Sequence, residues 1–408
     1  MDKLSSSKSF TLIELLVVIG ILAILTAAVV VVLNPAEYLK QARDTTRMND
    51  LGQINQALTV LESQGITSFG TANTVYVSIP DNASSTCGSL GLPTLPGYSY
   101  HCVTSANLQK IDSTGWIPVD FTQSTALAFS NLPLDPVNTT STGNYYTYTP
   151  GGSWELDTIL ESSKYRLNAI LSKTNLPGVY AKGSNLTLSP IYNNSGLMGY
   201  WGFNEGSGTT AHDSSGNGDD GTLSSPAPAW TSGKVGSGAL SFNGTSNYVE
   251  VPSSSVLSPS AQLTLSAWMK WDGVRDGVED WTTIIAKGSF GSGEYSVIFN
   301  RAPGFTYNQT RFYINGGNTV TWENFGGFDT GWHLLTFTYD GTNTKIYYDA
   351  GLVASGSYSS VITASANSLE IGRESTGDYR FGGLIDDVRV YNRALSVAEI
   401  QAIYNATK

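Results

Sequence analysis

The apolar run near the start of the chain opens with KSFTLIELLVVIG, residues 8–20. It continues to Leu33, and its 24 residues from Phe10 onward include one charged residue, Glu14. A helix rises about 1.5 Å per residue, so this one would be about 36 Å long, enough to span a bilayer core. The run is long for a signal peptide, and no A-x-A cleavage pattern follows it. We therefore expect a single-pass membrane anchor.

Glu14 is a functional candidate, because a carboxylate inside an apolar run is costly unless it is paired. The short basic leader, Phe10 and the following TLIELL resemble the N-terminus of type IV prepilins and type II secretion pseudopilins. The resemblance implies a leader at 1–9, cleavage between Ser9 and Phe10 by a prepilin peptidase, and N-methylation of Phe10. It also implies that Glu14 neutralises the Phe10 ammonium of another pilin subunit in a filament. Family members usually have Gly where Ser9 stands, and the alternative is an ordinary anchor with a chance glutamate.

The pattern after the apolar run predicts that the helix continues. Pro35 indicates a kink after Asn34, and Gly65 is a candidate C-cap. Apolar residues then recur at 3-4-3 spacing on one face, at Leu51, Ile54, Leu58 and Leu61. We expect one long pilin helix over 10–64, with its first half in the membrane or filament core and its second half on a globular head.

The segment 65–190 is polar and turn-rich and is expected to form a small β-rich pilin head. Strands are predicted at 74–79, 117–121 and 145–149. Because the anchor implies export, we expect Cys87 and Cys102 to form a disulfide, worth about 3 kcal/mol on the chain-entropy model, with two free thiols as the alternative. The Gly-, Asn- and Ser-rich composition of 180–195 indicates a linker, which we place at 191–197.

Residues 198–406 show short runs of alternating apolar and polar side chains separated by Gly, Asn and Asp clusters. The end is helical, with a capping box at 396–399. YWGFNEGSG (200–208) and GLIDDVRVYN (383–392) resemble motifs of the laminin-G-like, concanavalin A-like jelly-roll family. The expected fold class is therefore multidomain, α+β and all-β: a long N-terminal pilin helix with a small β-rich head, then an antiparallel two-sheet jelly-roll sandwich.

Two sets of residues in this domain are candidates for a structural calcium ion, Ca2+. Asp213, Asn217 and Asp219 alternate like the oxygen donors of a calcium loop, but Ser224 stands where a bidentate Glu would be. The resemblance suggests a second pair, Asn243 and Asp386. The alternative for the first set is a plain polar turn.

Aromatic residues in three expected loops, 272–281, 300–309 and 315–330, are candidates for ligand binding. Aromatic rings on the loops of a sandwich can stack on sugar rings, or they can cap the core. The residues in question are Trp281, Tyr307, Trp322 and Phe325. Motifs for nucleophilic catalysis, phosphate binding and metalloprotease activity are missing from the sequence, so we expect no enzyme.

The sequence thus predicts a type IV pilin-like subunit at the cell membrane that moves to an extracellular filament or the cell surface. Its laminin-G-like domain is expected to act as an adhesin for a glycan or protein ligand. The alternative is a pseudopilin of a secretion or DNA-uptake system, in which the sandwich is structural or docks substrate. The net charge of −11 argues against nucleic acid as a partner.

Overall fold

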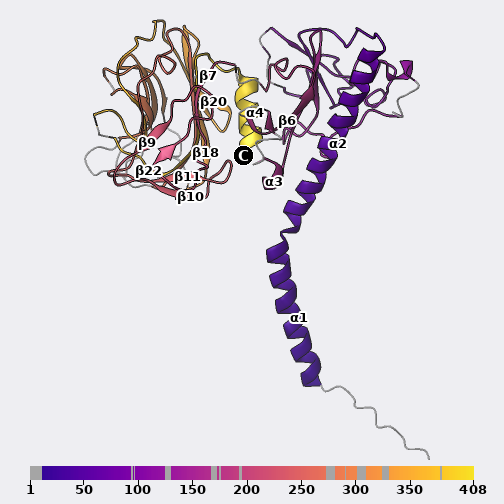
Figure 1. Ribbon diagram of the computed structural model, residues 1–408, viewed down its shortest axis with the longest axis horizontal. Coiled ribbons are helices and arrows are strands. Elements are labelled where there is room, and N and C mark those ends of the chain that lie inside the picture. The colour runs from indigo at the N-terminus through magenta and orange to yellow at the C-terminus, as the bar shows by residue number, and fades with distance from the viewer. Residues whose placement is uncertain are drawn as a thin grey trace, which may run out of the picture.

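The computed structural model describes residues 12–92, 95, 97–124, 130–166, 172–173, 176–192, 195–272, 281–289, 291–300, 309–323, 330–376 and 379–408. The side chains of 23–33, 172–173 and 176–177 are outside this description. Figure 1 shows three parts in a row: a helical stalk that ends in a small head, a short helix, and a β-sandwich.

The stalk consists of two helices, α1 (Leu12–Leu33) and α2 (Pro35–Ser63), rather than the single helix predicted over 10–64. Asn34 between them adopts a left-handed conformation with φ of 38°. Pro35 has no N–H to donate and is favoured at the first position of a helix, so it starts α2 afresh. The kink predicted at Pro35 is confirmed, and so is the C-cap, since Gly65 has φ of 87°.

Within the described residues, no helix is both long enough and apolar enough to cross a membrane. The membrane-spanning segment therefore stays a prediction.

The head is a six-stranded sheet covered on both faces. Helix α2 packs on one face through Leu51, Ile54 and Leu58, against Tyr148 and Trp154 of the sheet. The α2 face predicted from the 3-4-3 spacing is therefore confirmed. The strand order is β2 (Ser99–His101), β1 (Thr74–Val77), β3 (Thr147–Pro150), β4 (Trp154–Ile159), β6 (Leu176–Gly183) and β5 (Ser172–Lys173).

The head differs from the prediction in two places. Residues 117–121 do not form a strand: Asp120 makes an isolated bridge to Asp112, and a short 3₁₀ helix, η1 (Phe121–Gln123), follows. The stretch 180–195, whose composition indicated a linker, also begins inside a strand, because residues up to Gly183 belong to β6 and pair with β4. The sequence did not predict this strand because Pro177, Gly178 and Gly183 are residues that disfavour a strand interior.

The C-terminal part is the predicted antiparallel two-sheet sandwich. Its core lies between the two sheets and contains the inward side chains of both. The first sheet has the order β10 (Ala229–Thr231), β11 (Ala239–Asn243), β22 (Gly382–Tyr391), β13 (Leu263–Trp271), β18 (His333–Tyr339), β19 (Asn343–Tyr348) and β20 (Gly351–Ser357), with β7 (Leu197–Trp201) also paired to β22. The second has the order β17 (Gly317–Glu323), β16 (Gln309–Ile314), β15 (Tyr295–Asn300), β14 (Trp281–Lys287), β21 (Leu369–Ile371), β12 (Val249–Val251), β9 (Gly221–Leu223) and β8 (Thr210–Ala211).

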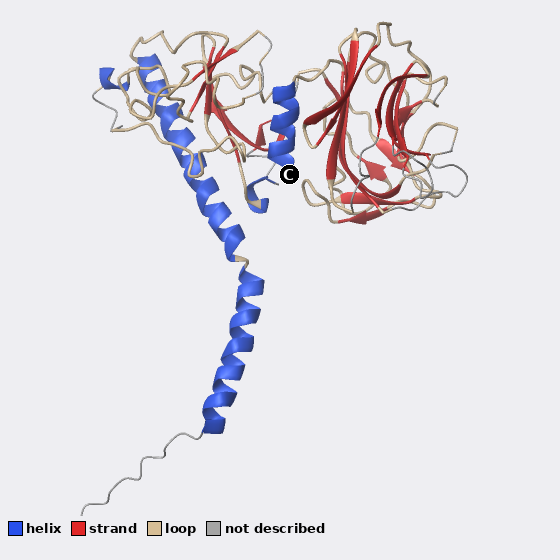
Figure 2. Cartoon of the chain, turned by 180° about the vertical axis from the view of Figure 1, so that it is seen from behind, coloured by secondary structure: helices blue, strands red, loops and turns tan. Residues whose placement is uncertain are grey.

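The last helix, α4 (Val397–Thr407), lies between the head and the sandwich (Figures 1 and 2). It begins with the predicted capping box, in which Ser396 and Glu399 bond each other's backbone N–H. Toward the sandwich, the Trp268 indole donates a hydrogen bond to Thr407 and stacks on Tyr404. Arg166 of helix α3 (Ser163–Arg166), in the head, donates hydrogen bonds to the carbonyls of Ala406 and Lys408 at the C-terminal end of α4. A cation at this end of a helix also interacts favourably with the helix dipole.

One buried cluster therefore joins the two domains, so their cores are not separate. The cluster combines Val75 and Val179 of the head sheet with Ile403 of α4 and Trp268 and Leu334 of the sandwich. Strand β13 is buried on both faces for the same reason: one face lines the sandwich core and the other is covered by α4.

We expect Ile403→Ala to destabilise the head and the sandwich together. Ile403 is buried in the shared cluster, and truncating such a side chain costs about 2–5 kcal/mol. Calorimetry of the full chain should show one main transition, shifted to lower temperature. Val397 lies on the same helix but is 39% exposed, so Val397→Ala should leave the transition nearly unmoved. Two wild-type transitions, of which Ile403→Ala moves one, would contradict the shared core.

Candidate functional site

Glu14 lies in the first turn of α1, where it is exposed to solvent and favourably placed for the helix dipole. Its neighbours Leu12 and Ile13 are 79% and 74% exposed, and the described side chains of α1 are all exposed. A contiguous apolar surface of this kind marks a protein or membrane contact. Ser9 and Phe10 lie outside the described residues, so cleavage and methylation stay predictions.

A buried charge network fixes the stalk to the head. Arg47 of α2 donates two hydrogen bonds to Asp135, at 2.7 and 2.9 Å, and others to Asp44 and Glu161 at 2.8 and 2.6 Å. Burial opposes ionisation of Glu161, but hydrogen bonds from Arg43 and Arg47 outweigh it and lower the pKa of this carboxyl. Removing one partner of a buried pair typically costs about 3–5 kcal/mol. The direction of the stalk is therefore tied to the fold of the head.

The predicted disulfide is confirmed. Cys87 and Cys102 are bonded, with their Cα atoms 5.2 Å apart. Both residues are buried in the shared cluster, so the bridge fixes the loop between them against the face of the head that α4 covers.

The first calcium candidate is built as a polar turn. The Asp213 carboxylate accepts hydrogen bonds from the backbone N–H groups of Tyr200, Ser215, Gly218 and Asp219. The Asn217 amide donates to the Met198 carbonyl at 2.8 Å, which directs it toward strand β7. The oxygens of Asp213 that a cation would need are therefore already used to hold the loop, and the turn alternative accounts for the sequence.

The second calcium candidate is not assembled. Asn243 is paired with Gly382, four residues before Asp386 along strand β22, a separation of about 13 Å. Calcium ligands lie about 2.3–2.6 Å from the ion, so one ion cannot reach both side chains. Among the described residues, no group of three His, Cys, Asp or Glu side chains could hold a metal.

Asp386 instead holds a loop of the sandwich in place. Its Oδ2 accepts hydrogen bonds from the backbone N–H groups of Lys234 and Val235, at 2.7 and 2.8 Å. Its Oδ1 is buried and, among the described residues, has no hydrogen-bond partner. Burial, together with the neighbouring charge of Asp387, raises the pKa of Asp386 to about 8.

Asp386 should make the protein less stable as the pH rises. Its pKa is about 8 in the folded chain and about 3.9 in an unfolded one, so the folded state holds the proton more tightly. The free energy of unfolding should therefore fall between about pH 4 and pH 8, by up to about 4 kcal/mol between pH 5 and pH 8. Urea denaturation across this range should show that fall in the wild type and a smaller one in Asp386→Asn.

Asp340→Asn is the control for this measurement. Partial burial would raise the pKa of Asp340, but hydrogen bonds from Thr342 and Asn343 keep it below its usual value. That carboxyl therefore titrates at lower pH and should leave the slope between pH 5 and pH 8 unchanged. Equal slopes for the wild type and Asp386→Asn would show that Asp386 is already ionised at pH 5.

The aromatic candidates separate into two groups. Tyr307 and Phe325 lie outside the described residues. Trp281 and Trp322 lie at the start of β14 and within β17, so the prediction that they stand on loops is wrong. Trp322 is paired with Thr310 on the same face as Phe312, so it packs against the sandwich core, with its ring 5.2 Å from that of Tyr348. Trp322 is thus a core cap, as the alternative supposed.

Trp281 is on the outward face of the second sheet. It is paired with Asn300, next to the core residue Phe299, and side chains alternate between the faces of a strand. The guanidinium of Arg311 lies 4.4 Å from the centre of its ring, a cation–π contact.

Polar side chains extend this contact into a patch, here called the Trp281 patch: Trp281, Gln309, Arg311, Tyr313 and Glu323. Arg311 donates to the side-chain oxygen Oε1 of Gln309 at 2.6 Å and to the Tyr313 hydroxyl at 3.3 Å, and the side-chain amide of Gln309 donates to Glu323 at 3.0 Å. The Arg311 Nε is buried and has no hydrogen-bond partner in the part of the chain that the structure describes. An indole beside oriented donors and acceptors is a surface that can bind a polar ligand.

Of the residues in this patch, the sequence pointed only to Trp281, and not to Gln309, Arg311, Tyr313 or Glu323. The alternation of side chains along β16 could have indicated the outward position of Arg311 and Tyr313. Phe312 and Ile314 face the core, so the residues next to them in the strand face outward. The contact between Arg311 and Trp281 joins two strands that are not adjacent, and no sequence pattern reports it.

Family models match two separate parts of the chain. Residues 4–30 match the model described as the prokaryotic N-terminal methylation motif. Residues 243–401 match the model described as the concanavalin A-like lectin/glucanases superfamily. The chain therefore combines the two parts that the sequence resemblance predicted. No curated protein matches it.

Solved structures are similar to the sandwich half of the chain. One is domain 4 of AbnA, a GH43 extracellular arabinanase from Geobacillus stearothermophilus, in complex with arabinotriose: 23% identity, TM-score 0.40, and 51% of this chain and 98% of that one covered. Another is the receptor binding domain of botulinum neurotoxin C/D mosaic serotype, with 15% identity, a TM-score of 0.39, and 52% of this chain and 51% of that one covered. The binding domain of Paraclostridial Mosquitocidal Protein 1 has 14% identity, a TM-score of 0.40 and 52% of each chain covered. This chain spans about half the length of the last two.

Proposed function

We propose that the protein is a type IV pilin-like surface subunit whose C-terminal sandwich binds a glycan or protein ligand, as an adhesin does. The observation that carries the proposal is the presence of a methylation motif and a concanavalin A-like domain at opposite ends of one chain. The shared cluster supports it, because a sandwich held rigidly on the head can be displayed in a fixed direction.

The N-terminal part would assemble the subunit. We propose that a prepilin peptidase cuts between Ser9 and Phe10 and methylates the new amine, while the chain is anchored in the membrane. In the filament, Glu14 would neutralise the Phe10 ammonium of a neighbouring pilin subunit, and the exposed apolar side chains of α1 would pack together. Opposite charges buried in an apolar bundle favour the stagger that pairs them.

The sandwich would bind its ligand without chemical turnover. Glycoside hydrolysis generally needs two carboxyl groups that flank the scissile bond. The Trp281 patch, as far as its residues are described, has one carboxylate, Glu323, which accepts a hydrogen bond from Gln309. Its aromatic ring and oriented polar groups suit recognition.

Mass spectrometry of the mature protein tests the assembly half of the proposal. We expect a chain that starts at N-methylated Phe10. Glu14→Val should leave cleavage intact but reduce incorporation into filaments at least tenfold, because the Phe10 ammonium loses its partner. A dominant species that keeps residues 1–9 would refute the pilin assignment. Mature protein confined to the envelope, with no surface filaments, would favour the alternative of a secretion or DNA-uptake pseudopilin.

A glycan array probed with the full chain tests the binding half. Trp281→Ala should reduce binding at least tenfold with little change in melting temperature, because the ring is on the outer face. Trp322→Ala is the contrasting variant: it should lower the melting temperature by several degrees, because its ring packs on the core. If Trp281→Ala binds glycans as well as the wild type, the Trp281 patch is not the ligand site.

A further inference from the structure

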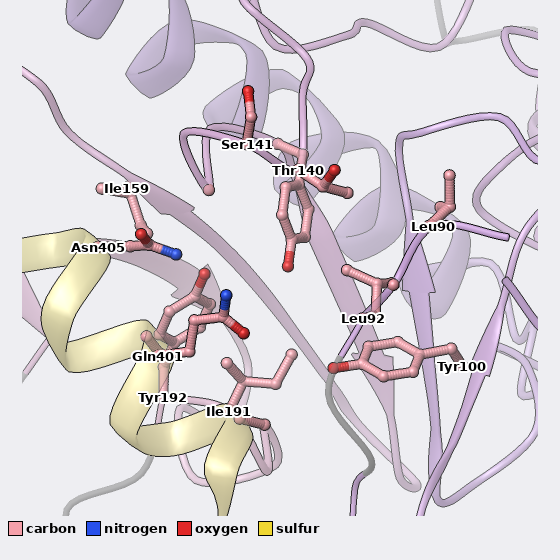
Figure 3. Close-up of a pocket in the computed structure, with 15 residues that line it drawn as sticks. Leu90, Leu92, Tyr100, Thr140, Ser141, Ile159, Ile191, Tyr192, Gln401 and Asn405 are labelled. Atoms are coloured by element: carbon pink, nitrogen blue, oxygen red, sulfur yellow. The ribbon is translucent and has the colours of Figure 1, made fainter. Parts of the chain in front are cut away.

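A pocket of about 230 Å³ lies at the junction of the head and helix α4 (Figure 3). We call it the seam pocket, and its polar lining includes Tyr100, Tyr145, Tyr192, Gln401 and Asn405, together with Thr140 and Ser141. The first two tyrosines come from the head, Tyr192 comes from the connection to the sandwich, and the two amides come from α4. The site therefore exists only when the C-terminal helix is docked on the head.

The disulfide shapes one wall of the seam pocket. Leu90, Leu92 and Tyr100 all lie in the loop that Cys87 and Cys102 close. Gly143 lines the opposite side, and a Cβ at this position would lie 2.7 Å from the Asn405 amide. The shape of the pocket is thus fixed by the disulfide in one wall and by the close contact between Gly143 and the Asn405 side chain in another.

Three tyrosine hydroxyls and one amide of this lining have no partner among the described residues, whereas the Asn405 side-chain oxygen accepts a hydrogen bond from Lys408 at 2.7 Å. Tyr192 and Tyr145 are 2% and 8% exposed, yet neither hydroxyl has a hydrogen-bond partner among the described residues, and the same holds for the Tyr100 hydroxyl and the Gln401 amide. In Figure 3 the Tyr100 hydroxyl and the Gln401 amide point into the same space. Gln401 is exposed and the tyrosine hydroxyls reach the surface of the pocket, so these groups are available to bond water or a ligand that enters it.

The tyrosine hydroxyls are neutral donors at any physiological pH. Burial raises the pKa of Tyr145 to about 12. Burial also raises the pKa of Tyr100 and Tyr192, and in both cases the neighbouring phenol of Tyr145 adds to the effect. The three hydroxyl groups are therefore close to one another and stay protonated.

The composition of the lining selects the chemistry of the ligand. None of the described residues that line the pocket is charged, although the chain as a whole carries a net charge of −11. The same pocket is also lined by the apolar side chains of Leu92, Ile159 and Ile191. A ligand that matches has several hydroxyl groups, no charge and an apolar face, and these are the properties of a sugar ring.

We propose that the seam pocket binds a neutral saccharide, one or two sugar units in size. Pockets for drug-sized ligands measure about 300–1,000 Å³, so a smaller cavity suits a smaller ligand. The Trp281 patch lies on the second sheet of the sandwich, whereas α4 covers the outer face of the first sheet. The seam pocket is therefore a second site, distinct from the one proposed for the adhesin.

Saturation-transfer NMR tests the proposal on the full-length protein. The exposed apolar side chains of α1 call for a detergent, which should be zwitterionic and free of sugar headgroups. The probes are glucose, galactose, N-acetylglucosamine, maltose and lactose. We expect at least one of them to bind, and we expect Tyr192→Phe and Gln401→Met each to weaken its binding about fivefold or more, because each removes a hydrogen-bonding group from the site.

Tyr98→Phe is the matched control. Tyr98 lies in the same disulfide-closed loop, but its hydroxyl donates to the Leu188 carbonyl and does not line the seam pocket. Binding by this variant should equal that of the wild type. Melting temperatures of all variants should stay near the wild-type value, and a Tyr192→Phe variant that keeps its fold but binds as tightly as the wild type overturns the proposal.

Two other results would also overturn the proposal. If none of the five saccharides binds the wild-type protein, the pocket holds water only. If Trp281→Ala abolishes binding and Tyr192→Phe does not, the sugar occupies the Trp281 patch, and the adhesin proposal stands while the seam pocket fails. Conversely, loss of binding with Tyr192→Phe alone supports the seam pocket and leaves the adhesin site to the glycan array.

Discussion

The burial of helix α4 on two opposite sides is the constraint that organises this protein. One side of the helix contacts the head sheet and the opposite side contacts the outer face of the sandwich. The head and the sandwich therefore bury these two surfaces together, through the same helix. Small residues make this possible: a Cβ on Gly178 would lie 2.6 Å from the Ala406 carbonyl, which only glycine avoids in this position. The C-terminal helix thus completes an N-terminal head, and the pocket with unpartnered hydroxyl groups arises at the same junction.

Buried ion pairs fix the position of particular elements within the head and within the sandwich. Arg47 fixes α2 to the head through Asp135 and Asp44. In the sandwich, Lys287 is fully buried and is held by Glu294 at 2.8 Å and by loop carbonyls. Such pairs need not add much net stability, but each is satisfied in one geometry, which favours a unique arrangement.

The motifs that carry the jelly-roll resemblance act structurally. Asp386 holds the 234–235 loop, and Asp387 is paired with Arg389 at 2.9 Å. Arg389 in turn lies 4.4 Å from the centre of the Tyr200 ring, so the YWGFNEGSG and GLIDDVRVYN segments meet across β7 and β22. They identify the fold because they build its central strands, and they contain no information on the ligand.

The sequence by itself determined the elements whose cause is local. Apolar spacing predicted the buried face of α2, Pro35 predicted the break, Ser396 and Glu399 predicted the start of α4, and alternation predicted the sandwich. The tertiary structure decided what depends on residues far apart in the chain: that 176–183 form a strand of the head sheet, that Trp322 caps the core while Trp281 meets Arg311, and that the two domains share a cluster. The physical reason is that propensity, capping and periodicity act over a few residues, whereas strand pairing and burial depend on which distant surfaces meet.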